Sequence, residues 1–177
     1  MSIKKLISES SLIYSNEQIG DAITIIADNC NLKLIDKEVT VLPVMNGALI
    51  FSGQLIPKLD FHCVLDYIHA SRYLNNKGQP TVNWIYKPKL NLIKDKIVLV
   101  IDDILDEGVT LNNIKKNLIE MGAKEVLIAV LFDKKRKKIK PIKADFFGLE
   151  VPDEYVYGFG LDFKGIGRNI PHLYAHK

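Results

Sequence analysis

Apolar residues repeat at helical spacing in two stretches of the chain. The first predicts a helix over roughly Asn16–Cys30, because Ser15-Asn16-Glu17-Gln18 has the spacing of a capping box and is followed by apolar positions at helical period. The second stretch predicts another helix that begins near Thr110, with Gly122 placed as the residue after its end. The apolar positions are Ile19, Ala22, Ile23, Ile26 and Ala27 in the first helix, and Leu111, Ile114, Leu118 and Ile119 in the second.

Segments rich in β-branched and aromatic residues predict strands. They are Val39–Leu42, Phe61–His69 and Val82–Tyr86, with a further helix expected over Gly47–Leu59. Two other segments, Ile97–Ile101 and Glu125–Phe132, are apolar without alternation. That pattern is typical of parallel strands covered on both faces.

A buried strand, a loop, a helix and a second buried strand together form a βαβ unit. We therefore predict one α/β domain over residues 1–177, with a doubly wound, mostly parallel sheet and flanking helices. The polar connection Arg72–Pro80 is of the kind that serves as a mobile lid. The tail, from Asp145 onward, alternates short strands (Phe146–Leu149 and Tyr155–Tyr157) with Gly, Pro and Asp turns.

Length and composition favour an ordinary globular domain, with 177 residues, 47% of them apolar and 25% charged. The apolar runs are too short to span a bilayer, and the segment after Met1 is no signal peptide, so we expect a cytoplasmic protein without a membrane partner. Cys30 and Cys63 form no CxxC pair and are expected to be reduced thiols.

The net charge of +3 is too small to make nucleic acid the default partner. Seven cations lie between Lys134 and Lys143, and we interpret most of them as a solvated loop.

The segment that carries chemistry follows the strand Ile97–Ile101. Asp102 and Asp103 come first, and Asp106-Glu107-Gly108-Val109-Thr110 then leads into the next helix. Gly108 frees the backbone to wrap an anion, and the N–H groups at a helix start can bind phosphate. Because carboxylates repel phosphate, a ligand for both features carries phosphate at one end and hydroxyls or a metal at the other, as a sugar phosphate does. Two adjacent acids by themselves would more simply be an acid cluster that caps the helix. The complete segment, an apolar strand followed by Asp102, Asp103 and Asp106–Thr110, favours a binding site for such a ligand.

The string Val98–Leu111 resembles the phosphoribosyl-pyrophosphate signature of the type I phosphoribosyltransferases, in the form found in bacterial hypoxanthine-guanine phosphoribosyltransferases. Looser similarity extends over Ser71-Arg72-Tyr73, Phe132-Asp133-Lys134, Val151–Asp162 and Arg168. The resemblance implies that fold, with a small hood built from chain ends, in which about residues 145–177 bind the base. It also implies a purine salvage reaction that converts hypoxanthine or guanine plus 5-phosphoribosyl 1-pyrophosphate to IMP or GMP plus pyrophosphate.

The resemblance also implies a role for each matching residue. Asp106 would transfer a proton near N7 of the base, while Asp102 and Asp103 would hold the ribose hydroxyls, directly or through Mg²⁺. Lys134 would bond the purine O6, with Tyr155 stacked on the ring, Val156 at the base edge and Asp162 beside the base and a second Mg²⁺. Phosphoribosyl pyrophosphate would be held by Asp102, Asp103, Asp106, Glu107, Gly108, Val109, Thr110, Met45, Asn46, Gly47, Arg72, Tyr73 and Arg168.

Departures from the family pattern concentrate in the pyrophosphate loop. Met45 stands where many relatives carry a cation and Asn46 where they often have glycine, so Arg72 is a candidate to supply the missing charge. Similarity to these relatives also implies a non-proline cis peptide at Val44–Met45.

Other functions receive less support from the residues. Neither Gly158-Phe159-Gly160 nor Gly165-Ile166-Gly167 completes a dinucleotide motif, the chain has no phosphate-binding P-loop, and its four histidines form no close metal pair. Two alternatives stay open: a xanthine-preferring enzyme of the same class, and a nucleotide-binding regulator that holds nucleic acid with residues 134–143. The resemblance also implies a homodimer or homotetramer.

Overall fold

The structure, a computed structural model, describes residues 3–74 and 77–176, with the backbone alone for residues 71–74 and 77–81. Its helices are α1 (Ile3–Ser8), α2 (Asn16–Leu34), α3 (Leu49–Leu55) and α4 (Val109–Glu120), with 3₁₀ turns at Ile56–Lys58 and Leu90–Leu92. Its strands are β1 (Ser10–Tyr14), β2 (Glu38–Met45), β3 (His62–Leu65), β4 (Ile68–Leu74), β5 (Lys77–Tyr86), β6 (Ile97–Leu105), β7 (Glu125–Lys134), β8 (Phe146–Val151), β9 (Tyr155–Tyr157) and β10 (Leu173–His176).

The large sheet has the strand order β5-β4-β2-β6-β7-β8, with β3 also paired to β2. Strands β2, β6, β7 and β8 run parallel to one another, and only β5 is antiparallel to its neighbour. The predicted doubly wound, mostly parallel α/β fold is confirmed.

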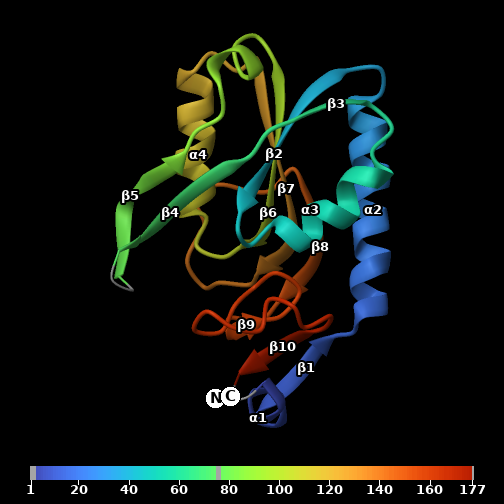
Figure 1. Ribbon diagram of the computed structural model, residues 1–177, viewed down its shortest axis with the longest axis vertical. Coiled ribbons are helices and arrows are strands. Elements are labelled where there is room, and N and C mark those ends of the chain that lie inside the picture. The colour runs from blue at the N-terminus through green and yellow to red at the C-terminus, as the bar shows by residue number, and fades with distance from the viewer. Residues whose placement is uncertain (1–2, 75–76, 177) are drawn as a thin grey trace.

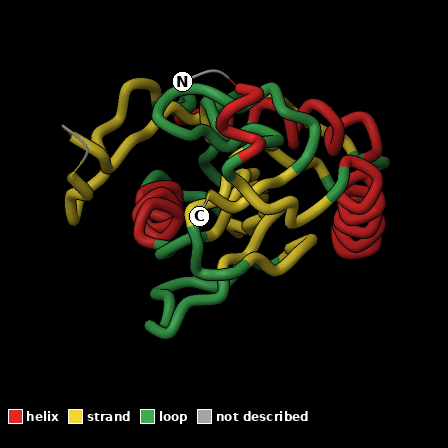
Figure 2. Tube along the Cα trace, turned by 90° about the horizontal axis from the view of Figure 1, so that it is seen from below, coloured by secondary structure: helices red, strands yellow, loops and turns green. Residues whose placement is uncertain are grey.

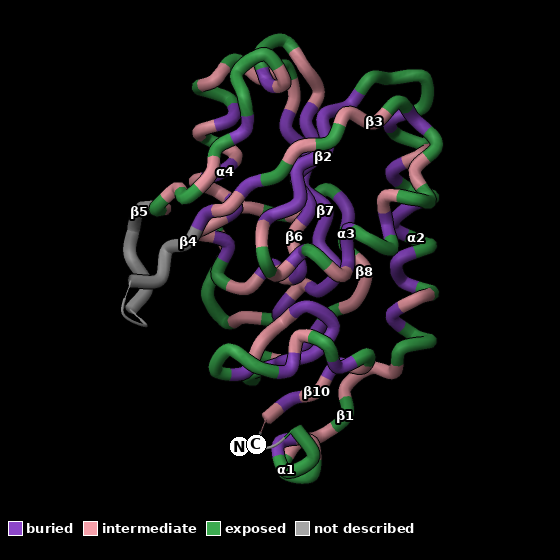
Figure 3. The backbone as a smooth tube through the Cα atoms, viewed as in Figure 1, coloured by how far each residue is buried: buried purple, intermediate pink, exposed green. Residues whose placement is uncertain are grey.

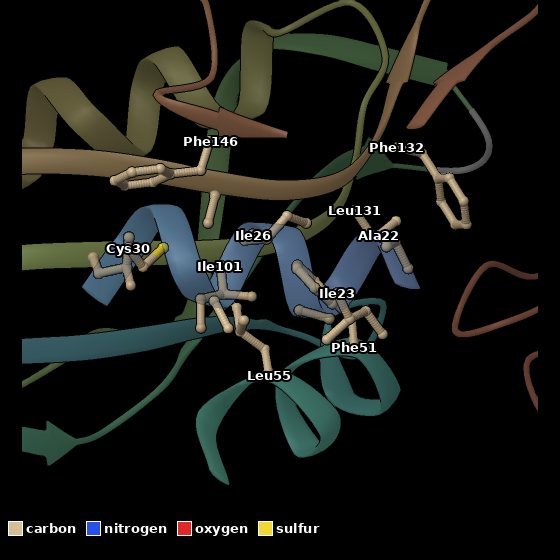
Figure 4. Close-up of a cluster of buried hydrophobic side chains, with 14 of the residues drawn as sticks. Ala22, Ile23, Ile26, Cys30, Phe51, Leu55, Ile101, Leu131, Phe132 and Phe146 are labelled. Carbon is tan, nitrogen blue, oxygen red and sulfur yellow. The ribbon is translucent and has the colours of Figure 1, made fainter. Parts of the chain in front are cut away.

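Helices cover both faces of this sheet (Figures 1 and 2). On one face, α2 and α3 enclose the core shown in Figure 4, in which Ile23, Phe51 and Leu131 are fully buried. On the other face, α4 packs Leu111, Ile114 and Leu118 against β6 and β7. This double cover explains why β6 and β7 carry continuous apolar runs, which form the buried centre of Figure 3.

Local sequence signals set the ends of the two long helices. Ser15 accepts a hydrogen bond from the Gln18 N–H while the Gln18 side chain accepts one from the Ser15 N–H, so the predicted capping box is present. Helix α2 continues past the predicted Cys30 to Leu34, which is fully buried. Helix α4 is followed by Gly122 at a φ of 88°, as its predicted position after the helix end requires.

Three predicted segments differ from the structure. The helix expected over Gly47–Leu59 is shorter, since α3 covers Leu49–Leu55 and a 3₁₀ turn containing Pro57 follows. The strand expected over Phe61–His69 breaks after Leu65, because β3 pairs with the start of β2 and β4 with its end. The backbone expected as a polar loop is extended instead, since β4 and β5 continue pairing up to Leu74 and Lys77; residues 75–76 lie outside the described residues.

A small antiparallel sheet, β1-β10-β9, lies at one end of the large sheet and holds both chain ends (Figure 1). Its core packs Leu6 of α1 against Tyr157, Phe163 and Ile170. The expected small hood built from chain ends is therefore present, with β1 from the N-terminal part of the chain, whereas β8, which lies within the expected range 145–177, belongs to the large sheet. None of the described helices combines the length and the apolar character that a membrane crossing requires.

Candidate functional site

Strand β6 carries two carboxylates to its carboxyl end. Asp103 is only 8% exposed, and Asp102 is partly buried beside it and accepts a hydrogen bond from the Asp103 N–H at 3.0 Å. Burial raises the pKa of Asp103 to about 6, and burial together with the Asp103 charge raises the pKa of Asp102 well above its usual value. Two acids held in this way are poised to accept a cation or hydroxyl donors.

The loop after β6 forms the start of α4. Gly108 adopts the left-handed conformation, with a φ of 78°, and the helix begins at the next residue. The first N–H groups of a helix have no acceptor within it, and they favour an anion. Residues 106–110, the anion cradle predicted from the sequence, therefore have a backbone geometry compatible with that role.

A cavity of about 280 Å³ brings this cradle together with the segment after β2. Val44, Met45, Asn46 and Gly47 line it opposite the aspartates, and Arg168 lines it from the hood. The non-proline cis peptide is Met45–Asn46, so the prediction of Val44–Met45 is wrong by one residue.

Two glycines allow these segments to approach. A Cβ on Gly47 would lie 2.1 Å from Asp103 Oδ2, and a Cβ on Gly160 would lie 2.4 Å from the Gly47 carbonyl oxygen. The backbone at Gly47 therefore lies directly against the Asp103 side chain, and the backbone at Gly160 lies directly against that of Gly47.

A second cavity, of about 850 Å³, adjoins the first and shares Asp103, Asp106, Asp162 and Arg168 with it. Its lining adds Lys134 from the end of β7 and hood residues that include Tyr155, Val156, Leu161, Lys164 and Gly165. Tyr155 is 53% exposed, and its ring meets the Phe163 ring edge-on, with 5.3 Å between the ring centroids.

Lys134 and Asp106 meet in this second cavity. Lys134 is 8% exposed, and its Nζ donates to Asp106 Oδ2 at 2.9 Å. The buried Lys134 ammonium can donate a hydrogen bond to an acceptor atom of a ligand. The Asp106 carboxylate beside it can accept a proton from a nearby atom of the same ligand.

Arg168 connects the hood to the aspartates. Its guanidinium donates to Asp162 Oδ1 and to the Gly160 carbonyl oxygen, each at 2.6 Å, and its charge acts to lower the pKa of Asp103. Asp162 also accepts a hydrogen bond from the Gly165 N–H at 2.8 Å, which fixes the turn.

Nearly all the residues predicted for the site line these two cavities. Those in the first are Met45, Asn46, Gly47, Asp102, Asp103, Asp106, Glu107, Gly108, Val109, Thr110, Asp162 and Arg168, and the second adds Lys134, Tyr155 and Val156. Arg72 and Tyr73 lie on β4, and their side chains are outside the described residues.

The interpretation of most cations in residues 134–143 as solvated is confirmed for Lys135, Lys137, Lys138 and Lys143, which are exposed, but it does not extend to Arg136 and Lys140. The Arg136 guanidinium lies 2.6 Å from Asp106 Oδ1, and Lys140 donates to Asp133 and to the Leu105 carbonyl oxygen. Arg136 is the site residue that the sequence reasoning missed, and its one signal was rarity: the chain has three arginines among its 24 basic residues.

Among the described residues, no group of three or more His, Cys, Asp or Glu side chains is placed to hold a metal ion. Mg²⁺ needs fewer protein ligands, since one or two carboxylates with substrate phosphates suffice. Asp102 and Asp103 supply two adjacent carboxyl groups, which is the number that Mg²⁺ needs from the protein. Burial raises the pKa of both groups, so a bound cation would stabilise their charged forms.

Comparison with protein families matches residues 9–164 to the family described as Phosphoribosyl transferase domain. Relatives named hypoxanthine-guanine phosphoribosyltransferase include that of Lactococcus lactis subsp. lactis, 32% identical over 96% of this chain and 88% of the relative. The Bacillus subtilis protein of the same name is also 32% identical, over 96% of this chain and 91% of its own length.

Solved structures give the same picture. A hypoxanthine phosphoribosyltransferase from Staphylococcus aureus superposes with a TM-score of 0.89 and 25% identity, covering 100% of this chain and 97% of the other. A hypoxanthine-guanine phosphoribosyltransferase from Bacillus anthracis superposes with a TM-score of 0.83 and 27% identity, over 93% and 95% of the two chains.

Proposed function

This chain belongs to the phosphoribosyl transferase family, and on that premise we propose that it is a purine salvage enzyme, a pentosyltransferase that joins hypoxanthine or guanine to the ribose of 5-phosphoribosyl 1-pyrophosphate. The products are IMP or GMP and pyrophosphate. The observation that carries the proposal is the meeting of Asp106 and Lys134, 2.9 Å apart, in a cavity that adjoins the anion cradle.

The base binds in the second cavity. Tyr155 packs against one ring face, and Lys134 donates to O6. Asp106 accepts the proton from N7 as N9 bonds to C1 of the ribose and the bond from C1 to pyrophosphate breaks. The pair observed between Lys134 and Asp106 opens as the base enters, because the purine offers a partner to each of them.

The ribose phosphate binds in the first cavity. The N–H groups of residues 108–110 and the Thr110 hydroxyl hold the 5′-phosphate, and Asp102 and Asp103 face the ribose hydroxyls. Breaking the bond to pyrophosphate builds positive charge on the ribose and negative charge on the leaving group. Arg168 stands where it can pair with that leaving group.

Mg²⁺ is the cofactor we propose, held by Asp102 and Asp103, with Asp162 near a second position. When bound, it neutralises the charge of the leaving pyrophosphate. Because no group of three or more possible ligands among the described residues is placed to hold a metal ion, the ion arrives mainly with the substrate.

Two alternatives use the same cavities. A xanthine-preferring enzyme would keep the Lys134 contact, because xanthine also carries an oxygen at C6. A regulator that holds nucleic acid would need free cations in residues 134–143, and the pairing of Arg136 with Asp106 and of Lys140 with Asp133 turns two of them inward.

We also propose a homodimer or homotetramer in the cytoplasm. An apolar groove beside α3 is lined by Pro43, Leu49, Ile56, Pro57 and Leu65, and Leu49 and Leu65 are more than half exposed. Exposed apolar surface of this kind supports association between copies, and light scattering would give the number of subunits. The free thiols of Cys30 and Cys63 suit a reducing compartment.

One assay tests the proposed reaction. Pyrophosphate release from 5-phosphoribosyl 1-pyrophosphate is followed with hypoxanthine, guanine, xanthine or no base, with Mg²⁺ present. Release that depends on hypoxanthine or guanine is the expected result. Release with xanthine alone would favour the xanthine enzyme, whereas no release together with salt-dependent RNA binding would favour the regulator.

A further inference from the structure

A second cation lies against the carboxylate of Asp106. Lys134 Nζ lies 2.9 Å from Oδ2, and Arg136 NH1 lies 2.6 Å from Oδ1, so each oxygen of the carboxylate has its own basic partner. Lys134 lines both the base cavity and a neighbouring cavity of about 370 Å³, whereas Arg136 lines the neighbouring cavity and not the base cavity. Arg136 therefore contacts Asp106 from outside the base cavity.

The same guanidinium reaches two other segments. NH2 lies 3.6 Å from a Glu107 oxygen in the anion cradle, and NH1 lies 3.3 Å from Asp153 Oδ1, just before β9 of the hood. Three carboxylates and two cations therefore form one cluster, in which Arg136 alone contacts all three acids. A planar guanidinium presents several donors at fixed angles, which a single ammonium cannot do.

These pairs have a small effect on folding stability. The Arg136 side chain is 26% exposed, and its three partners are 38% to 49% exposed. Ion pairs at such positions contribute little to folding, about 0–1 kcal/mol. We therefore expect the ion pairs of Arg136 to affect mainly the orientation of the Asp106 carboxylate.

We infer that Arg136 is a positioning residue, which holds the Asp106 carboxylate in its orientation when the base draws Lys134 away. The inference rests on the proposed function, because it requires Lys134 to leave Asp106 for the purine O6. With Arg136 in place, Oδ1 stays fixed by its ion pair and Oδ2 is free to turn toward the base. Without it, Asp106 loses the guanidinium that also pairs with Glu107 and Asp153, and the repulsion between Asp106 and these two acids is no longer offset by that charge.

The experiment is a double-mutant cycle with Arg136→Gln, Arg136→Lys and Asp106→Asn. Arg136→Gln is expected to lower kcat for hypoxanthine about 10–100-fold, as a misplaced catalytic group does, while KM for 5-phosphoribosyl 1-pyrophosphate changes less than about threefold. Arg136→Lys should recover part of the loss. In the Asp106→Asn background, Arg136→Gln should add less than about twofold, because its effect acts through that carboxylate.

The matched control is Lys137→Gln, which removes one positive charge from an exposed side chain next to Arg136 and should leave kcat unchanged. Equal losses from Arg136→Gln in both backgrounds would overturn the inference, and so would an unchanged kcat. The proposed function fails separately: a loss below about threefold in Asp106→Asn alone would remove the proton-transfer role from Asp106, whatever Arg136→Gln does.

Discussion

Asp103 should make the folded protein less stable at neutral pH, and Asp103→Asn should reverse that effect. The carboxyl is 8% exposed, and burial raises its pKa from 3.8 to about 6. Below about pH 4 the group holds a proton in both states, so it has no effect on stability there. Between about pH 4 and pH 6 the unfolded chain loses the proton while the folded chain keeps it, so the stability falls as pH rises.

The size of the effect follows from the shift. A rise of about two pKa units corresponds to about 3 kcal/mol of lost folding stability above pH 6. Asp102 and Asp103 titrate as a coupled pair, so removing one charge recovers only part of the loss, and we expect Asp103→Asn to gain about 1–3 kcal/mol in free energy of unfolding. Asparagine has nearly the size of aspartate, so the close approach of Gly47 to this side chain is preserved.

Urea unfolding in EDTA from pH 4 to pH 8 measures this directly. The difference in free energy of unfolding between Asp103→Asn and the wild type should grow up to about pH 6 and then stay constant. Asp21→Asn, at an exposed position of α2, is the control and should show no such growth. A difference that is flat with pH, or a variant less stable than the wild type at pH 8, would refute the reasoning. The variant should also bind the ribose substrate poorly, since the proposed role of Asp103 needs its charge.

Three further outcomes follow from the same geometry. Turnover should require Mg²⁺, and full turnover in EDTA would contradict the proposed cofactor. Lys134→Ala should depress kcat/KM for hypoxanthine and guanine together, by about 10-fold or more, whereas Lys137→Ala should leave both nearly unchanged; steady-state kinetics with each base gives the comparison. Gly47→Ala would place a Cβ 2.1 Å from Asp103 Oδ2 and should therefore raise KM for 5-phosphoribosyl 1-pyrophosphate; an unchanged KM would show that the loop can yield.

Features encoded in neighbouring residues could be predicted from the sequence. The segment 102–110 carries its acids, its left-handed glycine and its helix start in one short stretch, and the structure places all of them in one cavity. The capping box at Ser15 and the apolar runs of β6 and β7 are equally local, and they fixed the fold class.

Features that depend on distant partners could not be predicted. Strand β1 pairs with β10 at the other end of the chain, and no local pattern predicted this strand; a hood built from chain ends was implied by the family resemblance alone. Arg136 lies in a run of lysines, and apart from its being one of three arginines, only the folded positions of Asp106 and Asp153 distinguish it from them. The predicted strand Phe61–His69 breaks because two stretches of it pair with successive parts of β2, which no local pattern records.

The central claim is that this site selects a 6-oxopurine through Lys134, and kcat/KM for adenine beside hypoxanthine tests it most directly. Lys134 is a donor at neutral pH, so it bonds the O6 of hypoxanthine but faces the amino group of adenine, donor against donor. A buried charged group left unpaired costs about 1–3 kcal/mol or more, so adenine should be slower by at least about 10-fold. Comparable values for the two bases would mean that Lys134 does not recognise O6, and the assignment to 6-oxopurines would be wrong.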